Sequence, residues 1–453
     1  MNPENKKQKS KTTRRRFVQA GAAAAGVSLT GQARAAKSET LAVSGGSRTV
    51  TFPKKEHYEA SHWPRYGPDD KKLVLEILDL NSGACYRELA RFEKDWKEYF
   101  KAPFVKTHCN GTSALTSMFF ALDFPPGSEI LVPTYTFFST CSAMRFFGCV
   151  PIFVDIKPNT ACFDLDYAAK VMTKRTKAIL PMHSWGLPCE MDAIRDFAEK
   201  HGLVLLEDAA HAHGASMKDK RTGKWELMGN WGDMSIFSFQ ATKPLPALEG
   251  GMGMYKKREY YERAASFGHY KVPPTLPKDS PYHKYHGTGL GLKFRIHPLA
   301  AALGRTQLAK LDERNAKGVA QVRRLNDRIC QLPGLSEPVC RSDQKRVYYS
   351  QNLLFLDEAK AGFTKQALLK ALKAEGVWKG WGDYPLQHKY ALYHEAKWWH
   401  HKPDVPKELP GAEEVNRRSV TLPYFTRDVP ELIDQYIVAF EKVWSHRKQL
   451  AKL

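Results

Sequence analysis

Residues 235–251 read SIFSFQATKPLPALEGG, and this stretch decides the fold. The apolar run from Met234 to Phe239 predicts a short buried strand, and Gly250-Gly251 leads into a second one. Lys243 stands between them in a loop punctuated by Pro and Gly, from which its amine can reach into a pocket. Lysine amines form Schiff bases with carbonyls where burial or a nearby charge favours the neutral amine. Taken alone, the pattern also fits a solvated loop lysine.

Two further stretches supply groups that suit a lysine in this position. Residues 203–211 read LVLLEDAAH, an apolar strand ending at Asp208, and carboxylates at such strand ends lie where open α/β sheets bind ligands. Residues 108–115 read HCNGTSAL, which predicts a strand, a turn at Gly111-Thr112, and a helix whose free N–H groups can hold a phosphate. A lysine, a carboxylate and a phosphate cradle are the protein parts that pyridoxal 5'-phosphate (PLP) requires.

Six short motifs follow one another along the chain. They are Asn110-Gly-Thr-Ser-Ala-Leu115, Val132-Pro-Thr-Tyr-Thr-Phe137, Arg175-Thr-Lys-Ala178, Glu207-Asp-Ala-Ala-His-Ala-His-Gly214, Ser238-Phe-Gln-Ala-Thr-Lys243 and Glu249-Gly-Gly251. On these motifs, and over roughly residues 80–440, the chain resembles the DegT/StrS-like sugar aminotransferases, PLP-dependent enzymes of fold type I. Because the motifs occur in the order that the family has, the resemblance is specific.

The resemblance implies a role for each residue around the cofactor ring. Lys243 would anchor PLP covalently and then move a proton as a general base. Asp208 would pair with the pyridine nitrogen and keep it protonated, although alone it could also cap the following Ala-rich turn. His211, often Gln in the family, would contact the ring or its phenolic oxygen. Phe137 would stack on the ring, or else be a core aromatic.

The resemblance also implies the phosphate ligands. Gly111 and Thr112 would offer backbone N–H groups and a hydroxyl, and Ser238 a second hydroxyl. The family carries G-x-N-x-R where this chain has Gly291-Leu-Lys-Phe-Arg295, so Lys293 stands at the Asn that reaches the phosphate of the neighbouring subunit. A lysine there can make a charge-assisted contact instead. A homodimer with shared active sites is therefore expected.

Alternating strand and helix patterns predict an α/β fold with a mainly parallel sheet between helices. Strands are expected at 130–132, 150–154, 178–180, 203–206, 234–239 and 251–254, and helices at 73–100, 112–122, 139–147, 165–174, 191–201 and 295–311. This large PLP-binding domain is predicted to span residues 61–310. A smaller α+β domain is expected at 311–453, with helices at 365–375 and 430–444 and a strand near 348–356.

Composition narrows the classes of partner. The 453-residue chain is 43% hydrophobic and has a formal charge of +21, which suggests an anionic substrate, a polyanionic surface or nucleic acid. Zinc-finger spacing, an RNA-binding aromatic signature and a helix-turn-helix pattern are all missing from the sequence, so nucleic acid is not predicted as a partner. The eight cysteines are scattered without metal-site spacing, and no metal site is predicted.

Residues 1–35 are interpreted as an export signal, followed by a polar linker at 36–60. Thr13-Arg-Arg-Arg-Phe17 carries a twin arginine, and Ala20 to Leu29 is apolar but too short to span a bilayer. Ala33-Arg-Ala35 offers small residues for cleavage. We expect export to the periplasm through the twin-arginine machinery, without a stable membrane span; the alternative is a disordered basic tail.

The expected activity is transfer of an amino group from Glu or Gln to a keto-sugar or a related cyclic polyol ketone. Some relatives that catalyse dehydration have His at the position of Lys243, so the lysine favours transamination. Two alternatives stay open: other PLP chemistry such as dehydration or racemisation, and a non-catalytic exported protein that binds sugar or an anionic envelope polymer. The presence of both Lys243 and Asp208 argues against the non-catalytic alternative.

Overall fold

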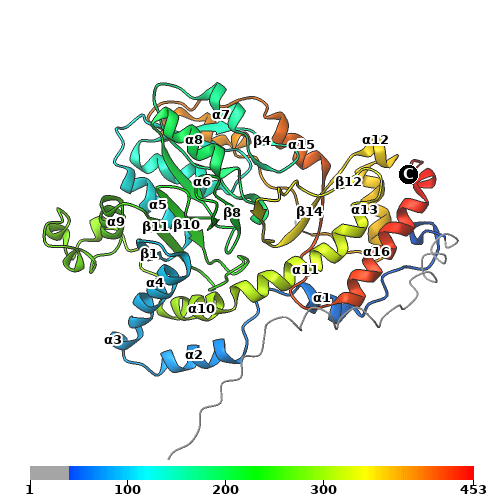
Figure 1. Cartoon of the computed structure of the whole chain (residues 1–453), viewed down its shortest axis with the longest axis horizontal. Coiled ribbons are helices and arrows are strands. Elements are labelled where there is room, and N and C mark those ends of the chain that lie inside the picture. Colours follow the sequence, from blue (N-terminus) through cyan, green and yellow to red (C-terminus); the bar gives the residue numbers. More distant parts are fainter. Residues whose placement is uncertain (1–39, 381, 453) are drawn as a thin grey trace, which may run out of the picture. The chain divides into compact units, whose positions relative to one another are not determined.

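The computed structural model describes residues 40–380 and 382–452, so the predicted export signal at 1–35 lies outside it. Within this range a seven-stranded sheet has the order β1-β11-β10-β7-β6-β2-β3 (Figure 1). Its strands are β1 (Phe104–His108), β2 (Glu129–Pro133), β3 (Val150–Val154), β6 (Thr176–Ile179), β7 (Val204–Asp208), β10 (Met234–Ser238) and β11 (Gly251–Tyr255). β11 runs antiparallel to β1 and β10, whereas the other neighbours pair in parallel. The predicted mainly parallel sheet is confirmed.

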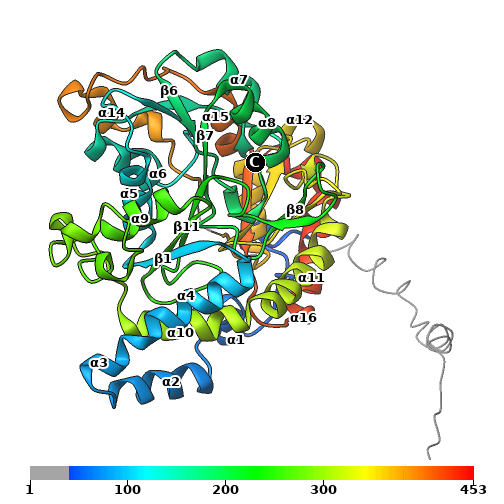
Figure 2. The same ribbon diagram turned by 60° about the vertical axis from the view of Figure 1, so that its left-hand side comes forward.

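Helices cover both faces of this sheet (Figure 2). They include α4 (Arg87–Phe100), α5 (Gly111–Leu122), α6 (Phe138–Ser142), α7 (Leu165–Val171), α8 (Met191–His201), α9 (Arg258–Ser266) and α10 (Pro298–Ala309). Farther from the sheet, α2 (Pro68–Leu78) packs against α10, and α3 (Ser82–Cys85) against α4. Successive side chains of a strand point to opposite faces, so Ile130 packs in one buried cluster with α5 while Leu131 packs in another with α8. Burial on both faces explains why these strands are almost continuously apolar.

The chain after α10 builds a smaller α+β part with a buried cluster of its own. In this described region, β12 (Leu335–Ser336), β14 (Gln351–Leu356) and β15 (Ser419–Pro423) form an antiparallel sheet. Its main helices are α11 (Leu311–Ile329), α13 (Lys365–Ala374) and α16 (Pro430–Ser445), with shorter ones at α12 (Glu358–Ala361) and α17 (Arg447–Leu450). Residues of α14 (Ala391–His394) and α15 (Pro410–Arg418) are buried in the cluster of the large sheet instead. Short ladders join β4 (Ile156–Lys157) to β5 (Cys162–Phe163), and β8 (Ser216–Lys218) to β9 (Trp225–Leu227) and β13 (Gln344–Lys345).

Residues 40–60, which the sequence suggested as a linker, pack against the C-terminal part instead. Val50 is buried in its core, and α1 (Lys54–Ser61) follows directly. The carboxylate of Glu375 accepts hydrogen bonds from the N–H groups of Ala42 (2.8 Å) and Thr49 (3.0 Å). A buried carboxylate is stable only when it is hydrogen-bonded or paired, so this contact holds the segment in place.

Residues beyond the expected domain boundary at 310 also pack against the large sheet. Leu386 forms an isolated bridge with Tyr135, and Tyr393 and Leu409 are buried in the core cluster of the large sheet. The C-terminal half of the chain therefore contributes a return segment to the PLP-binding part. This segment brings Tyr384 to the edge of the sheet where the site residues lie.

Two helix predictions differ from the structure in their bounds. The helical periodicity of 73–100 is broken after α2, because Asn81 caps a new turn with its side chain. The helix expected from Arg295 begins only at Pro298, since His297 caps it and proline favours the first helical position.

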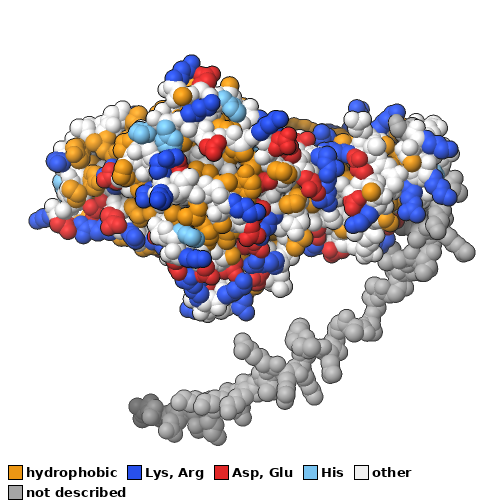
Figure 3. Space-filling view, turned by 90° about the horizontal axis from the view of Figure 1, so that it is seen from above, with side chains coloured by type: hydrophobic (Ala, Val, Ile, Leu, Met, Phe, Trp, Pro, Cys, Tyr) orange, Lys and Arg blue, Asp and Glu red, His pale blue; other side chains and the backbone are white. Residues whose placement is uncertain are grey.

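Two surface properties bear on partners. On the face shown in Figure 3, Lys and Arg side chains are interspersed with Asp and Glu, so the excess positive charge does not gather there into one patch. Among the helices of residues 40–380 and 382–452, none combines the length and the apolar character needed to cross a membrane.

Candidate active site

The predicted site residues meet at the carboxyl ends of three strands. Asp208 ends β7, Lys243 follows β10, and Gly111 follows β1 at the start of α5. β10 pairs in parallel with β7, and β1 and β10 both run antiparallel to β11, so the three strands end on the same edge of the sheet. The motifs that were far apart in sequence are therefore brought together.

Asp208 is buried, with 3% of its surface exposed, and both of its carboxylate oxygens accept a hydrogen bond. Thr140 Oγ1, from α6, donates to Oδ2 at 2.6 Å, and the N–H of Ala210 donates to Oδ1 at 3.1 Å. Burial raises the pKa of Asp208 above its ordinary value, while these hydrogen bonds and the charge of Lys243 act in the opposite direction. The turn-capping contact that the sequence allowed is thus present, and each oxygen can still accept a hydrogen bond from a second donor.

The neighbouring Glu207 anchors the strand end rather than the site. Its buried carboxylate accepts hydrogen bonds from His183 Nε2 (3.1 Å) and from the N–H groups of Gly229, Trp231 and Gly232 at 2.6–2.8 Å. Although burial opposes ionisation, these donors hold the pKa of Glu207 below its ordinary value. The N–H of Cys189 donates to His183 Nδ1, which leaves the proton of that imidazole on Nε2, toward Glu207. The network fixes the end of β7, and with it Asp208.

Lys243 is partly buried, and its amine contacts a residue from the C-terminal half of the chain. Nζ donates to the hydroxyl of Tyr349 at 3.3 Å, and that hydroxyl also hydrogen-bonds Thr242 Oγ1 at 2.9 Å. The backbone of the lysine loop is held as well: Lys243 N–H donates to Gln240 at 2.8 Å, and the indole of Trp63 donates to the Lys243 carbonyl at 3.1 Å. The lysine therefore projects from a braced turn and not from a free loop.

Aromatic rings line the space beside Lys243. His211 lies 4.0 Å from the ring of Tyr349 and 5.6 Å from that of Trp185, with Tyr384 at 6.0 Å. Burial, followed by the charge of Lys243, lowers the pKa of His211 well below its ordinary value, so this imidazole is neutral near pH 7. Its Nδ1 is buried and has no hydrogen-bond partner among the described residues. A buried polar atom without a partner is suited to a hydrogen bond with a bound group.

The start of α5 has the form of a phosphate cradle. Asn110 caps the helix by accepting from the N–H of Ser113 at 2.8 Å, while Gly111 and Thr112 occupy the first helical positions. A Cβ on Gly111 would lie 2.8 Å from the Cβ of Ser238, so glycine keeps the space between these residues open. N–H groups at a helix N-terminus with a hydroxyl beside them suit a phosphate. The residues present therefore fit PLP at both its phosphate and its ring.

Two predicted site residues stand at the surface of the described chain. Phe137 precedes α6, is 49% exposed, and has its ring 4.4 Å from that of Phe138. Lys293 is exposed in the segment between η7 (Gly289–Gly291) and α10. Neither position tests the role expected of the residue, and both roles stay predictions.

The structure adds three residues that sequence reasoning missed. Thr140 supplies the donor to Asp208, Tyr349 contacts Lys243, and Trp185 stacks beside His211. Thr140 lies one helical turn beyond the Val132–Phe137 motif, which was the one available signal. Tyr349 had none, because it lies 106 residues from its partner.

A lysine, a buried carboxylate and a helix N-terminus at the carboxyl edge of a mainly parallel sheet define a PLP-dependent enzyme of fold type I. Residues 64–440 match the DegT/DnrJ/EryC1/StrS aminotransferase family, and the chain belongs to it. The family resemblance expected from the six motifs is confirmed. The family is PLP-dependent, and the chain is an aminotransferase.

Known proteins of this family resemble the chain over most of its length. The spore coat polysaccharide biosynthesis protein SpsC of Bacillus subtilis (strain 168) is 28% identical over 393 residues, which cover 86% of this chain and 98% of that protein. A putative L-glutamine:3-amino-2,3-dideoxy-scyllo-inosose aminotransferase of Streptomyces kanamyceticus is 29% identical, covering 91% and 93%. The structure of DesI in the presence of its TDP-sugar product superposes with a TM-score of 0.69 at 27% identity, covering 91% of this chain and 98% of that one.

Proposed function

We propose that the protein transfers an amino group from glutamate or glutamine to a keto-sugar or a related cyclic polyol ketone, in amino sugar biosynthesis. The observation that carries the proposal is Lys243, braced at the end of β10, beside Asp208 at the end of β7. The relatives support the acceptor class, because their names include a polysaccharide biosynthesis protein, an inosose aminotransferase and an enzyme with a TDP-sugar product. One of these names also specifies L-glutamine as the donor.

Each residue of the site has a distinct task in this reaction. PLP, when bound, would supply the electron sink that stabilises negative charge on the substrate carbon. Gly111, Thr112 and Ser238 would bind its phosphate, and the Asp208 carboxylate would hold a proton on its ring nitrogen. Lys243 would anchor it and then, as a free amine, carry a proton between the substrate carbon and the cofactor carbon.

The surroundings of Lys243 suit a ring-shaped, hydroxylated acceptor. Trp185, Tyr349 and Tyr384 offer flat apolar faces, and the Tyr349 hydroxyl offers a donor and an acceptor close to the reacting amine. The hydroxyl of Tyr349 lies within reach of Lys243 Nζ and can orient that amine. Other PLP chemistry, dehydration included, fits the same cofactor pocket but has no residue that favours it over transamination.

A half-reaction screen tests the proposal. Purified holoenzyme is mixed with single amino donors, and loss of the cofactor absorbance near the visible edge identifies the donor. The aminated enzyme is then offered keto-sugars and inososes, and return of the absorbance identifies the acceptor. A protein that shows no change with glutamate, glutamine or any other amino donor is not the proposed enzyme.

The second subunit belongs to the same proposal. We infer a homodimer in which Lys293 reaches the phosphate held by the partner, while Phe137, exposed on the single chain, stacks on the cofactor. Mixing a Lys293→Ala chain with a Lys243→Ala chain should restore activity, because each hybrid contains one intact site. The idea fails if hybrids form and remain as inactive as both homodimers.

The export signal lies outside the described residues and is proposed from the sequence alone, from Thr13-Arg-Arg-Arg-Phe17, the apolar segment Ala20 to Leu29 and the small residues Ala33-Arg-Ala35. We propose that the chain is loaded with PLP in the cytoplasm and then crosses the membrane folded by the twin-arginine route. A tightly bound cofactor also stabilises the folded chain, by about 4 kcal/mol at a thousandfold excess over its dissociation constant. Fractionation of cells that make the wild type or the triple Lys variant tests this, since only the wild type should reach the periplasm with its cofactor.

A further inference from the structure

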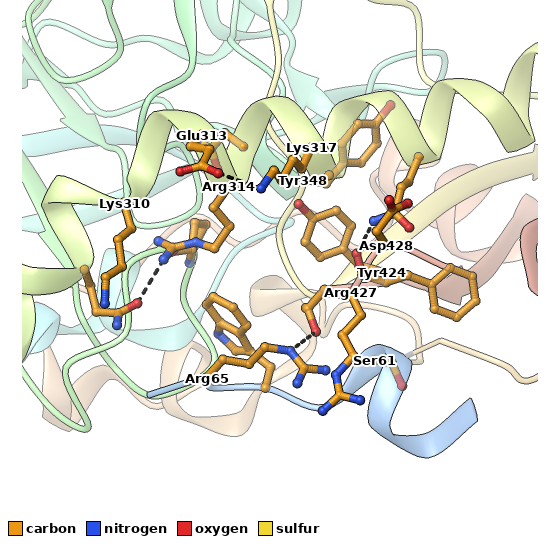
Figure 4. Close-up of a pocket in the computed structure, with 18 of the residues that line it drawn as sticks. Ser61, Arg65, Lys310, Glu313, Arg314, Lys317, Tyr348, Tyr424, Arg427 and Asp428 are labelled. Carbon is orange, nitrogen blue, oxygen red and sulfur yellow. Dashed lines mark hydrogen bonds and ion pairs between the residues drawn. The ribbon is translucent and has the colours of Figure 1, made fainter. Parts of the chain in front are cut away.

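A second pocket lies beside the backbone of the lysine loop (Figure 4). It has a volume of about 470 Å³, within the range of roughly 300–1,000 Å³ that small-molecule sites occupy. Its walls come from residues 61–70, from the start of α11 and from residues 424–428, and Thr242 and Pro244 close one side. Both neighbours of Lys243 in sequence therefore line this pocket.

The pocket is distinct from the space that faces Asp208. Tyr348 and Ser350 line it, whereas Tyr349 between them contacts Lys243 and His211. Tyr348 and Tyr349 are successive residues whose side chains face different spaces, so the backbone between them separates the two sites. An occupant of the pocket would touch the lysine loop without occupying the ring site.

Five basic and three acidic side chains line the pocket, which has a net charge of +2. Two of the basic groups are neutralised locally: Lys310 pairs with Asp70 at 3.1 Å, and Lys317 with Glu313 at 2.5 Å. Arg427 contacts Glu59 at 3.3 Å, outside the set of lining residues. The positive charge that remains is thus carried by guanidinium groups.

Two of these guanidiniums make only neutral hydrogen bonds within the described part of the chain. Arg65 donates to Thr426 Oγ1 at 2.8 Å and to the carbonyl of Glu59. Arg314 donates to Gln307 Oε1 at 2.9 Å and to the carbonyl of Pro244. Guanidiniums without a carboxylate in a partly buried pocket favour a bound anion.

Burial and a neighbouring like charge disfavour the charged form of these two guanidiniums. Burial lowers the pKa of Arg314 to about 10, and burial followed by the charge of Arg427 lowers the pKa of Arg65. Arg65 and Arg427 both line the pocket and lie next to each other, as Figure 4 shows. An anion between two like charges would relieve their repulsion.

We propose that this pocket binds a phosphorylated small molecule other than the amino acceptor, with its phosphate between Arg65 and Arg427. Arginine forks suit phosphate because they donate paired hydrogen bonds in one plane. Arg314 would contribute further positive charge, and Asp428 and Glu313 would accept hydrogen bonds from hydroxyl groups on the body of the ligand. With Glu59, which pairs with Arg427, counted as well, the net charge of the pocket is +1, a sign that favours a bound phosphate.

The test is isothermal titration calorimetry on PLP-loaded enzyme, in which the phosphate cradle at α5 is already filled. The probes are inorganic phosphate and glucose 1-phosphate, with glucose as the uncharged comparison. We expect one saturable site per chain for the phosphorylated probes, affinity that falls with added salt, and no binding of glucose. Absence of saturable binding by both phosphorylated probes at low salt would overturn the proposal.

Variants locate the site. Arg65→Gln and Arg427→Gln should each weaken binding of glucose 1-phosphate by about tenfold or more, as expected for the loss of a charge-assisted hydrogen bond. The matched control is Arg324→Gln on α11, an exposed arginine paired with Asp434, and it should change nothing. Arg65→Lys retains the charge without the fork and should bind with intermediate affinity. Equal affinity in wild type and both Gln variants, all folded by circular dichroism, would place the anion elsewhere.

A competition experiment distinguishes a separate phosphorylated ligand from a phosphate group that belongs to the amino acceptor. If the amino acceptor identified in the half-reaction screen leaves glucose 1-phosphate bound, the pocket has its own ligand, as proposed. If the acceptor displaces it competitively, the pocket is part of the acceptor site and the proposal of a separate ligand is wrong. The calorimetric test needs no turnover, so its failure would leave the aminotransferase proposal untouched.

Discussion

Thr140→Val is the substitution that most directly isolates the support of the buried carboxylate. Thr140 Oγ1 donates to Asp208 Oδ2 at 2.6 Å and accepts from Thr136 Oγ1 at 2.9 Å. Valine has nearly the same shape as threonine, so the change removes the donor while leaving the packing of α6 almost unchanged. Asp208 keeps the N–H of Ala210 as its other donor.

The size of the effect follows from the charge on the acceptor. A hydrogen bond to a charged group contributes about 1.5–3 kcal/mol, so its loss should slow turnover by about 10- to 150-fold if Asp208 must be ionised. The Thr140 donor lowers the pKa of Asp208, so its removal raises that pKa further. Because the carboxylate form is the active one, the acidic limb of the pH–rate profile should move to higher pH.

Single-turnover reaction with the amino donor, followed by absorbance across pH, measures both quantities. Thr136→Val is the matched control, since it removes the outer hydroxyl but leaves Thr140 free to donate, and it should change the rate only a few-fold. A folded Thr140→Val enzyme with the wild-type rate and an unmoved acidic limb would refute the role assigned to this hydrogen bond. A rate loss without a shift of that limb would also contradict it.

Three further predictions follow from contacts in and near the site. Gly111→Ala places a Cβ 2.8 Å from that of Ser238 and should weaken PLP binding by at least about tenfold, measured by titrating the apoenzyme with PLP; unchanged affinity would exclude the cradle. Tyr349→Phe removes the partner of Lys243 Nζ and should slow the half-reaction by about 2- to 12-fold, with a wild-type rate arguing against orientation of the amine. Burial lowers the pKa of His108 to about 3, against about 6.5 when unfolded, so its contribution to stability is present above pH 6.5 and lost as pH falls. Between pH 8 and pH 5 His108 should lower the free energy of unfolding by about 2 kcal/mol, and this part of the loss should be absent in His108→Gln. Denaturant unfolding of both proteins at both pH values measures it. An equal loss in the wild type and the variant would show that the assignment is wrong.

Local patterns were enough to predict most of the sheet. The strand Val150–Val154 and the helix Met191–His201 have the bounds that the sequence suggested, because each is a single apolar or amphipathic run with clear ends. Asp208, Lys243 and Gly111 were also found, since each stands at a strand end inside a short motif. The antiparallel direction of β11 could not be predicted from the residues.

Contacts between distant segments could not be predicted in this way. Glu375 accepts from Thr49 across 326 positions, so the polar composition of residues 40–60 suggested a linker where the chain is packed. Thr140 is 68 residues from Asp208, and Tyr349 is 106 from Lys243. No spacing rule connects such pairs, because the fold and not the local sequence sets their separation.

We propose that Lys243 is the residue to which the cofactor is covalently attached. Borohydride reduction of the purified holoenzyme, followed by proteolysis and mass spectrometry, measures this directly. We expect a reduced pyridoxyl group on the peptide that contains Lys243, and no such adduct in Lys243→Ala. An adduct on another lysine, or none on an enzyme that retains its cofactor absorbance, would contradict it.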